Sequence, residues 1–230
     1  MKKLTLTLLA SVAVIALIFA NVQIAIAADD VSNTKHRIAS YSGSSTAQYG
    51  GPQICVYCHT PHNSNSTVAA PLWNRNVESS GFTMYSSPTL NMVPSGAPTG
   101  VSLACLSCHD GQIALDVIVN MPGRDGDTRA TPAGLKMGST GNPDYDPMLT
   151  RDLSDDHPIS LAYPLGAATT VGDDEMFNSL PTDLSFFDDV VAGRTIQCAT
   201  CHNPHEATIE KFLRKDNKNG SVLCLTCHKK

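Results

Sequence analysis

Apolar positions form one long run, at the beginning of the chain, and follow no sustained period afterwards. Residues 4–20 are apolar with few interruptions, after Met1-Lys2-Lys3 and before Ala25-Ile26-Ala27. A charged start, an apolar stretch and a small-x-small site are typical of a secretory signal peptide. We therefore expect residues 1–27 to be removed on export, rather than kept as an anchor, which needs about 20 apolar residues.

After residue 27, Gly, Pro, Ser, Thr and Asn are frequent, and aromatic residues make up 6% of the chain. Such a chain buries too little apolar surface to offset its backbone entropy unless another group supplies a core. The pattern predicts short helical turns and little strand. Residues 158–163 fit a short strand, and residues 112–119 fit a short strand or helix.

All eight cysteines lie in four Cys-x-x-Cys-His motifs, which is the attachment signature of c-type haem. The two thiols bond to the porphyrin, and the adjacent histidine becomes the proximal iron ligand. The sequence therefore predicts four haems c, whose apolar faces supply the missing core; residues 180–191, with Phe186 and Phe187, could pack on one of them. The motifs are Cys55-Val-Tyr-Cys58-His59, Cys105-Leu-Ser-Cys108-His109, Cys198-Ala-Thr-Cys201-His202 and Cys224-Leu-Thr-Cys227-His228.

The four motifs alternate between two types. The first and third continue to Pro61-His62 and Pro204-His205, whereas the second and fourth share C-L-[ST]-C-H. We interpret this order as two duplicated dihaem modules, residues 28–146 and 147–230, in a mostly irregular, haem-cored cytochrome with short helices. The first module carries an insertion within residues 63–100, and residues 123–146, dense in Gly, Pro and Asp, read as a linker.

Four histidines remain outside the motifs: His36, His62, His157 and His205. A lone histidine is usually a solvated side chain, but four haems need four distal ligands, and His62 and His205 recur at the same place. We expect all four to bind iron. Methionine is the competing ligand, although none recurs at equivalent places. The candidates are Met84, Met92, Met121, Met137, Met148 and Met176.

Position along the chain suggests which histidines share a haem. His62 and His205 follow a proximal histidine by three residues, so each more plausibly reaches the other haem of its module. His36 and His157 precede the first and third motifs and would serve those haems. The hypothesis gives the pairs His59/His36, His109/His62, His202/His157 and His228/His205.

Other chemistry explains the motifs less well. Cys198, Cys201, Cys224 and Cys227 could form a zinc ribbon, and cysteines of an exported protein can form disulfides. Neither reading accounts for the histidine that follows every pair. The formal net charge of −5, more negative without Lys2 and Lys3, argues against nucleic acid as a partner. Six-coordinate irons would leave no open position for a substrate, which favours an electron carrier over an enzyme.

These motifs and the segments around them resemble a family: the exported tetrahaem c-type cytochromes of metal-reducing bacteria, in particular the OmcE-like subunits of extracellular cytochrome nanowires. The resemblance covers most of the chain after residue 27 and includes Asn33-Thr-Lys-His36, Pro71-Leu-Trp73-Asn-Arg75, Asp156-His157-Pro158 and Phe212-Leu-Arg214.

The resemblance implies a continuous haem stack in which one subunit donates a histidine to a haem of its neighbour, with His36 as the natural donor. It also implies an extracellular location, a homopolymer, and other multihaem cytochromes or extracellular metals as redox partners. Two alternatives stay open. One is a monomeric periplasmic shuttle in which His36 binds within its own chain. The other is a multihaem reductase with an open haem site.

Overall fold

A computed structural model describes residues 31–38, 54–90, 92, 95–115, 117–120, 136–138, 146–164, 177–190 and 193–229. Most of this part of the chain is irregular, as the sequence predicts. No helix within it is long and apolar enough to cross a membrane. The expected signal peptide, residues 1–27, and most of the expected linker lie outside the described residues.

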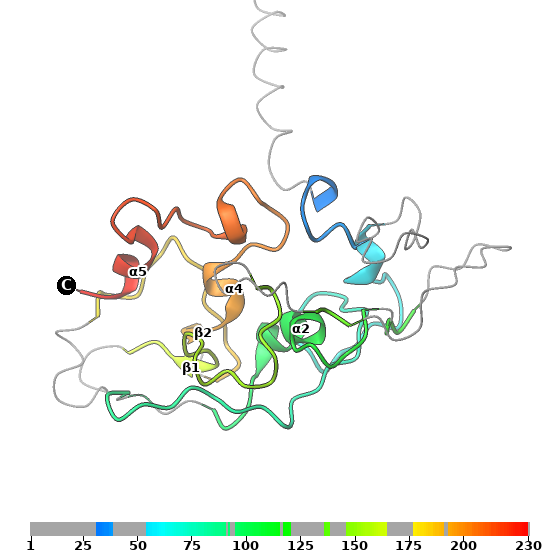
Figure 1. Cartoon of the computed structure of the whole chain (residues 1–230), viewed down its shortest axis with the longest axis horizontal. Coiled ribbons are helices and arrows are strands. Elements are labelled where there is room, and N and C mark those ends of the chain that lie inside the picture. The colour runs from blue at the N-terminus through cyan, green and yellow to red at the C-terminus, as the bar shows by residue number, and fades with distance from the viewer. Residues whose placement is uncertain are drawn as a thin grey trace, which may run out of the picture.

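The regular elements are short (Figure 1). They are, in chain order, the 3₁₀ helices and α-helices η2 (Val31–Asn33), η4 (Cys55–Tyr57) and α2 (Gly100–His109), the strands β1 (Leu161–Ala162) and β2 (Thr195–Ile196), and the helices α4 (Cys198–Cys201), η7 (Glu210–Phe212) and α5 (Val222–Cys227).

Each Cys-x-x-Cys-His motif lies on a helical turn, which confirms that expectation. Cysteines three residues apart share one face of a helix, so both thiols of a motif can reach the same group. In three motifs the histidine N–H donates to the carbonyl of the first cysteine, at 2.8 Å for His59, 3.1 Å for His202 and 2.9 Å for His228. The turn therefore ends at the histidine, whose side chain leaves the helix there.

β1 lies within residues 158–163, where the sequence predicts a strand, and β2 pairs with it. β1 and β2 are antiparallel, with Leu161 opposite Ile196. Tyr163 packs with them in a buried cluster, which Leu180 and Phe186 cover. Residues 180–191 thus contribute to a protein core. The expectation of a helix or strand at 112–119 is wrong for the described residues there, which form only isolated bridges.

α2 packs directly against α4, so the second and third motifs are neighbours (Figure 1). Ser102 donates to the side chain of Gln197 and accepts from the backbone N–H of Cys198 at 3.0 Å. Gln197 Nε2 in turn donates to Asp189 at 2.6 Å. Gly100 starts α2 with a φ of +53°, and a Cβ there would lie 2.7 Å from the Asp189 side chain.

These contacts cross the boundary expected near Asp146. So does the hydrogen bond from Leu149 N–H to the carbonyl of His109, at 2.9 Å. The two halves therefore share packed contacts, and their division into modules at residues 28–146 and 147–230 stays a prediction.

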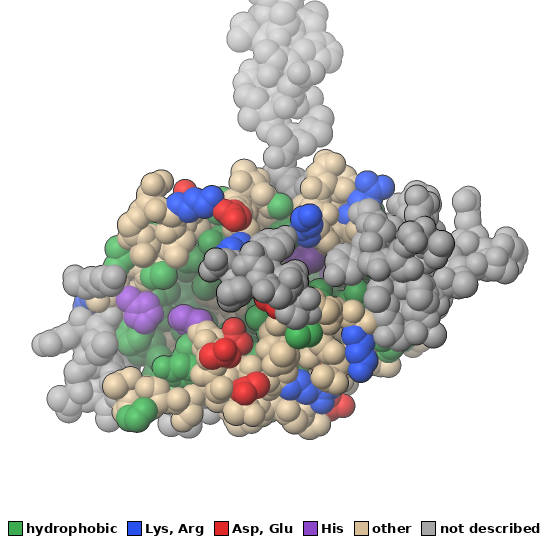
Figure 2. Space-filling view, in the orientation of Figure 1, with side chains coloured by type: hydrophobic (Ala, Val, Ile, Leu, Met, Phe, Trp, Pro, Cys, Tyr) green, Lys and Arg blue, Asp and Glu red, His purple; other side chains and the backbone are tan. Residues whose placement is uncertain are grey.

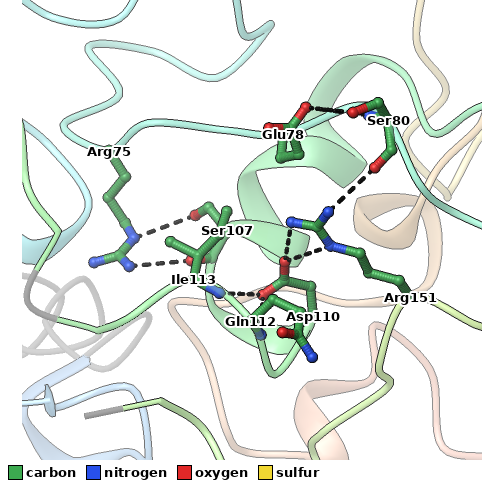
Figure 3. Close-up of polar contacts among 8 residues, drawn as sticks. All are labelled: Arg75, Glu78, Ser80, Ser107, Asp110, Gln112, Ile113 and Arg151. Atoms are coloured by element: carbon green, nitrogen blue, oxygen red, sulfur yellow. Dashed lines mark hydrogen bonds and ion pairs between the residues drawn. The ribbon is translucent and has the colours of Figure 1, made fainter. Parts of the chain in front are cut away.

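The buried carboxylate of Asp110 follows the last residue of α2 and binds the backbone after it (Figure 3). Asp110 is fully buried and accepts from the backbone N–H groups of Gln112 and Ile113, both at 2.9 Å. Arg151 Nε and Nη2 each donate to its second oxygen at 3.2 Å. The guanidinium of Arg151 lies 5.4 Å from the ring centre of Phe82. These bonds fix the chain directly after His109.

We predict that Asp110→Asn lowers the free energy of unfolding by about 1–3 kcal/mol, because a buried acceptor set loses its charge and one acceptor becomes a donor. Glu78→Gln is the matched control, since Glu78 is an exposed carboxylate in the same region (Figure 3) and should change stability by about 0.5 kcal/mol or less. Chemical denaturation followed by circular dichroism measures both. Equal effects of the two substitutions would contradict the role given to Asp110.

Candidate haem centres

Backbone carbonyls hold five of the eight histidine rings. A carbonyl oxygen can only accept, so Nδ1 carries the proton and the lone pair of the neutral ring lies on Nε2. This is the arrangement that metal-binding histidines show. The Nδ1–oxygen distances are 2.8 Å for His36 to Pro204, 2.6 Å for His59 to Pro71, 2.6 Å for His109 to Pro147, 3.0 Å for His157 to Pro158 and 2.8 Å for His202 to Lys211.

Burial also favours the neutral form of three histidine rings, two of which are among the five held by carbonyls. It lowers the pKa of His36, and it lowers the pKa of His109 and His228. For His36 and His109, the carbonyl at Nδ1 acts in the opposite direction, but burial is the larger effect. Desolvation therefore favours the uncharged imidazole, which is the form that binds iron.

The chain after the first and third motifs folds in the same way. Thr60 N–H donates to Leu72 at 2.9 Å, and Asn203 N–H donates to Phe212 at 2.8 Å. Leu72 and Phe212 both have positive φ, 52° and 59°. In each case the chain turns back over the motif and delivers the carbonyl that holds the proximal histidine.

Asn74 and Arg214, two residues after Leu72 and Phe212, also bond to their motifs in the same way. The backbone N–H of Asn74 donates to Cys58, and that of Arg214 donates to Cys201, both at 2.8 Å. Their side chains bind the residue after the first cysteine of each motif. The distances are 2.6 Å for Asn74 Nδ2 to Val56 O and 2.9 Å for Arg214 Nε to Ala199 O.

Three pairs of histidine rings lie at one spacing. Their centroids are 6.2 Å apart for His36 and His109, 6.1 Å for His59 and His205, and 6.4 Å for His157 and His228. A metal between two imidazole nitrogens, at about 2 Å from each, places the ring centres about 6 Å apart. Histidine side chains also lie among hydrophobic ones on the face that Figure 2 shows.

None of these pairs is one that chain position suggested. His205 lies beside His59 instead of serving the fourth motif, and His36 lies beside His109 instead of His59. His157 lies beside His228 instead of His202. The reason is that contacts between the two halves, including α2 on α4, bring the third motif close to the first and second. The ring neighbours in the structure thus differ from the pairs suggested by position along the chain, and which histidines share an iron stays a prediction.

His62 and His202 remain after these pairs. Both are exposed, and within the described residues neither ring forms a ring contact with another histidine. The repeat Pro-His after the first and third motifs thus leads to two different surroundings. His205 lies beside His59, whereas His62 forms no ring contact with another of the described histidines.

Cysteines of successive motifs are neighbours. Burial raises the pKa of Cys58 to about 12, and Cys108 adds to the rise. The Cys105 thiol shares a hydrogen bond with Cys198. Burial raises the pKa of Cys201 to about 11, and Cys227 adds to it. The cysteines of the four motifs therefore follow one another in space in their order along the chain.

A bound haem fits this donor set. The eight cysteines are unpaired, and six rings are arranged as three couples with room for a metal. Trp73 Nε1 is a buried donor that has no partner among the described residues, and its ring meets that of His59 edge-on at 5.9 Å. An acceptor on a group bound at His59, such as a haem propionate, would satisfy it.

The other chemistries find less support. Within the described residues, no three of the His, Cys, Asp and Glu side chains converge as a zinc site requires. Of the candidate methionines, Met92 packs on the Tyr163 cluster and Met148 lies against Gly111, while Met121 and Met176 are outside the described residues.

Residues 189–230 match the family described as Doubled CXXCH motif, Paired_CXXCH_1. This segment contains the third and fourth motifs. A comparison with curated proteins finds no match. The family match indicates a multihaem c-type cytochrome that binds haem c covalently, a class that carries electrons.

We predict that replacing Cys224 and Cys227 together by Ser removes one covalently attached haem, because both thioether bonds of the fourth motif are lost. Mass spectrometry of the purified protein would show a loss of one haem mass relative to the parent. Leu225→Ala is the control, since Leu225 lies between the same cysteines but has no group that bonds to haem. An unchanged mass in the double variant, beyond the two substitutions, would refute haem attachment at this motif.

Proposed function

We propose that this chain is an electron carrier with four haems c, one at each Cys-x-x-Cys-His motif, each with a histidine on both faces of the iron. The three histidine pairs at 6.1 to 6.4 Å carry this proposal. A haem held by two histidines exchanges single electrons without a change of ligand and leaves no position for a substrate. The protein's part is to hold the rings in place through their Nδ1 hydrogen bonds.

The ring pairs give a revised set of ligands. His205 would complete the first haem opposite His59, His36 the second opposite His109, and His157 the fourth opposite His228. The third haem, at His202, has no distal histidine within the chain by this count. The neighbouring cysteines of successive motifs support an electron path that runs through the haems in motif order.

The duplication into two dihaem modules belongs to the same proposal. Four matching hydrogen bonds join the first and third motifs to the loops that follow them, through loop residues that short haem motifs do not dictate. Matched turns outside the motif itself support descent from one ancestral segment.

We further propose that the subunits form a filament in which His62 of a second copy completes the haem at His202. His62 is exposed and His202 lacks a partner ring, so each supplies what the other needs. Donation from one copy to the next makes a head-to-tail contact, which generates open filaments when the rotation does not close. The protein would be exported, as the sequence of residues 1–27 suggests, and would act outside the cell.

This assignment replaces His36 as the donor. His36 stacks on Phe212 with ring centres 4.3 Å apart, and its Nδ1 bonds to Pro204 at 2.8 Å. Leaving its own chain would break both contacts. The exposed, unpaired His202 also supports a second candidate function, a reductase with an open iron position at the third motif.

We predict that the ferric wild-type protein is low-spin at the three haems with paired rings, and that His205→Ala turns one of these three high-spin, because the ring opposite His59 is lost. Electron paramagnetic resonance measures the high-spin fraction. Lys35→Ala, an exposed change next to His36, is the control and should leave the spectrum as it is. A His205→Ala spectrum identical to that of the wild type would contradict the pairing.

We predict that His62→Ala abolishes filaments and gives a monomer with one high-spin haem, because the third haem loses its ligand from the second copy. Negative-stain microscopy and light scattering give the assembly state. His36→Ala is the discriminating control: it should also make one haem high-spin but should leave filaments in place. Filaments that survive His62→Ala would reject His62 as the donor, and a wild-type monomer with one high-spin haem would favour the reductase.

A further inference from the structure

Arg75 is a buried cation bonded to the second haem motif. Its side chain is fully buried, and all its acceptors are neutral. Nε donates to Ser107 Oγ at 3.2 Å, Nη2 to the carbonyls of Ser107 and Ala114 at 3.0 and 2.8 Å, and Nη1 to the carbonyl of Leu115 at 2.7 Å. Figure 3 shows the guanidinium pointing at Ser107, which lies between Cys105 and Cys108.

Lys215 occupies the same place after the third motif. Arg75 follows Asn74, and Lys215 follows Arg214, the two residues whose N–H groups bond to equivalent cysteine carbonyls. Lys215 Nζ donates to Thr226 Oγ1 at 3.0 Å. Thr226 stands between the cysteines of the fourth motif, as Ser107 does in the second. In both halves, a cation on the loop after one motif thus contacts the next motif.

The charges of the two cations are balanced differently. Lys215 forms an ion pair with Asp183. Arg75 forms no ion pair with a carboxylate of the described residues, and the nearby Asp110 is already paired with Arg151. Arg75 and the Asp110–Arg151 pair therefore sum to one positive charge beside the second motif, whereas Lys215 and Asp183 cancel at the fourth.

An unopposed buried cation favours the reduced state of a neighbouring redox centre, because reduction adds one negative charge to that centre. The interaction is strong where water is excluded and weak where the charge is screened or paired. Arg75 is buried, so its effect persists at physiological salt. The Lys215–Asp183 pair is partly exposed, so its net effect is small.

We propose that Arg75 raises the reduction potential of the haem at Cys105–His109 above that of the haem at Cys224–His228, where Asp183 cancels Lys215. The inference rests on the proposed haem occupancy of these motifs. One consequence is a preferred direction of electron transfer: moving an electron from the haem at the fourth motif to the haem at the second lowers the free energy. Two motifs with the same sequence pattern would then differ through the charge of one loop residue.

The test compares charge with hydrogen bonding at Arg75. Arg75→Gln removes the charge, and it should lower the potential of one haem. Arg75→Lys keeps the charge but loses most of the four hydrogen bonds that Arg75 donates. It should leave that reduction potential near the wild-type value and lower the midpoint of denaturation. Spectroelectrochemical titration gives the potentials, and nuclear magnetic resonance of the haem methyl groups assigns them, since neighbouring haems titrate as a coupled set. Equal shifts in the two variants would overturn the proposal.

A second test uses substitutions at the partly exposed Lys215–Asp183 pair, which are less prone to unfold the protein than those at buried Arg75. Asp183→Asn frees the charge of Lys215 and should raise the potential of the haem at the fourth motif, by less than Arg75→Gln lowers that of the second. Adding Lys215→Met should cancel the rise. Glu210→Gln is the matched control, because Glu210 is an exposed carboxylate paired with Lys218, and it should shift nothing.

An Asp183→Asn potential that moves no more than that of Glu210→Gln would also overturn the proposal. A different result would reject the proposed haem-binding function itself. A wild-type protein without redox steps in the titration would reject the haem assignment itself, whereas four haems with equal potentials in all variants would reject only the role of the two cations.

Discussion

The packing of α2 on α4 is the contact on which the rest of the arrangement depends. A buried serine on one helix and a buried glutamine before the other, Ser102 and Gln197, bond to each other and to the start of the third motif. Gly100 is required at the start of α2 because any side chain would strike Asp189. Through this contact the third motif lies beside the second, and the loop after the third motif reaches the first two.

Irregular chain, rather than regular secondary structure, does the positioning in this protein. In the part of the chain that the structure describes, a sheet of two short strands and helices of at most ten residues could not orient eight histidines. Carbonyls from loops hold five of the rings instead, and they fix which nitrogen carries the proton. Irregular backbone is suited to this task because its carbonyls are not already used in a helix or sheet. Each such bond leaves Nε2 available for a metal.

The loops after the first and third motifs share one geometry but differ in their charge environment. The turn, the carbonyl on the proximal histidine and the cation on the next motif are the same after the first and third motifs. Only the surroundings of the cation differ, since Arg75 is buried among carbonyls and Lys215 meets Asp183 at the surface. Covalent chemistry and coordination can thus be repeated while the local charge is changed independently.

The sequence by itself located the four candidate attachment motifs, because the reaction of thiols with haem needs a fixed spacing within a few residues. It also predicted the helical turns at the motifs, the strand near residue 160 and the scarcity of regular structure, which all follow from local pattern. It could not predict which histidines face one another. That outcome depends on α2 meeting α4, and on loops far apart in the chain whose contacts have no local signature. The tertiary structure alone decided that His205 lies beside His59, and that among the described histidines His62 and His202 pair with no other, because such contacts are set by distances in space and not by distances along the chain.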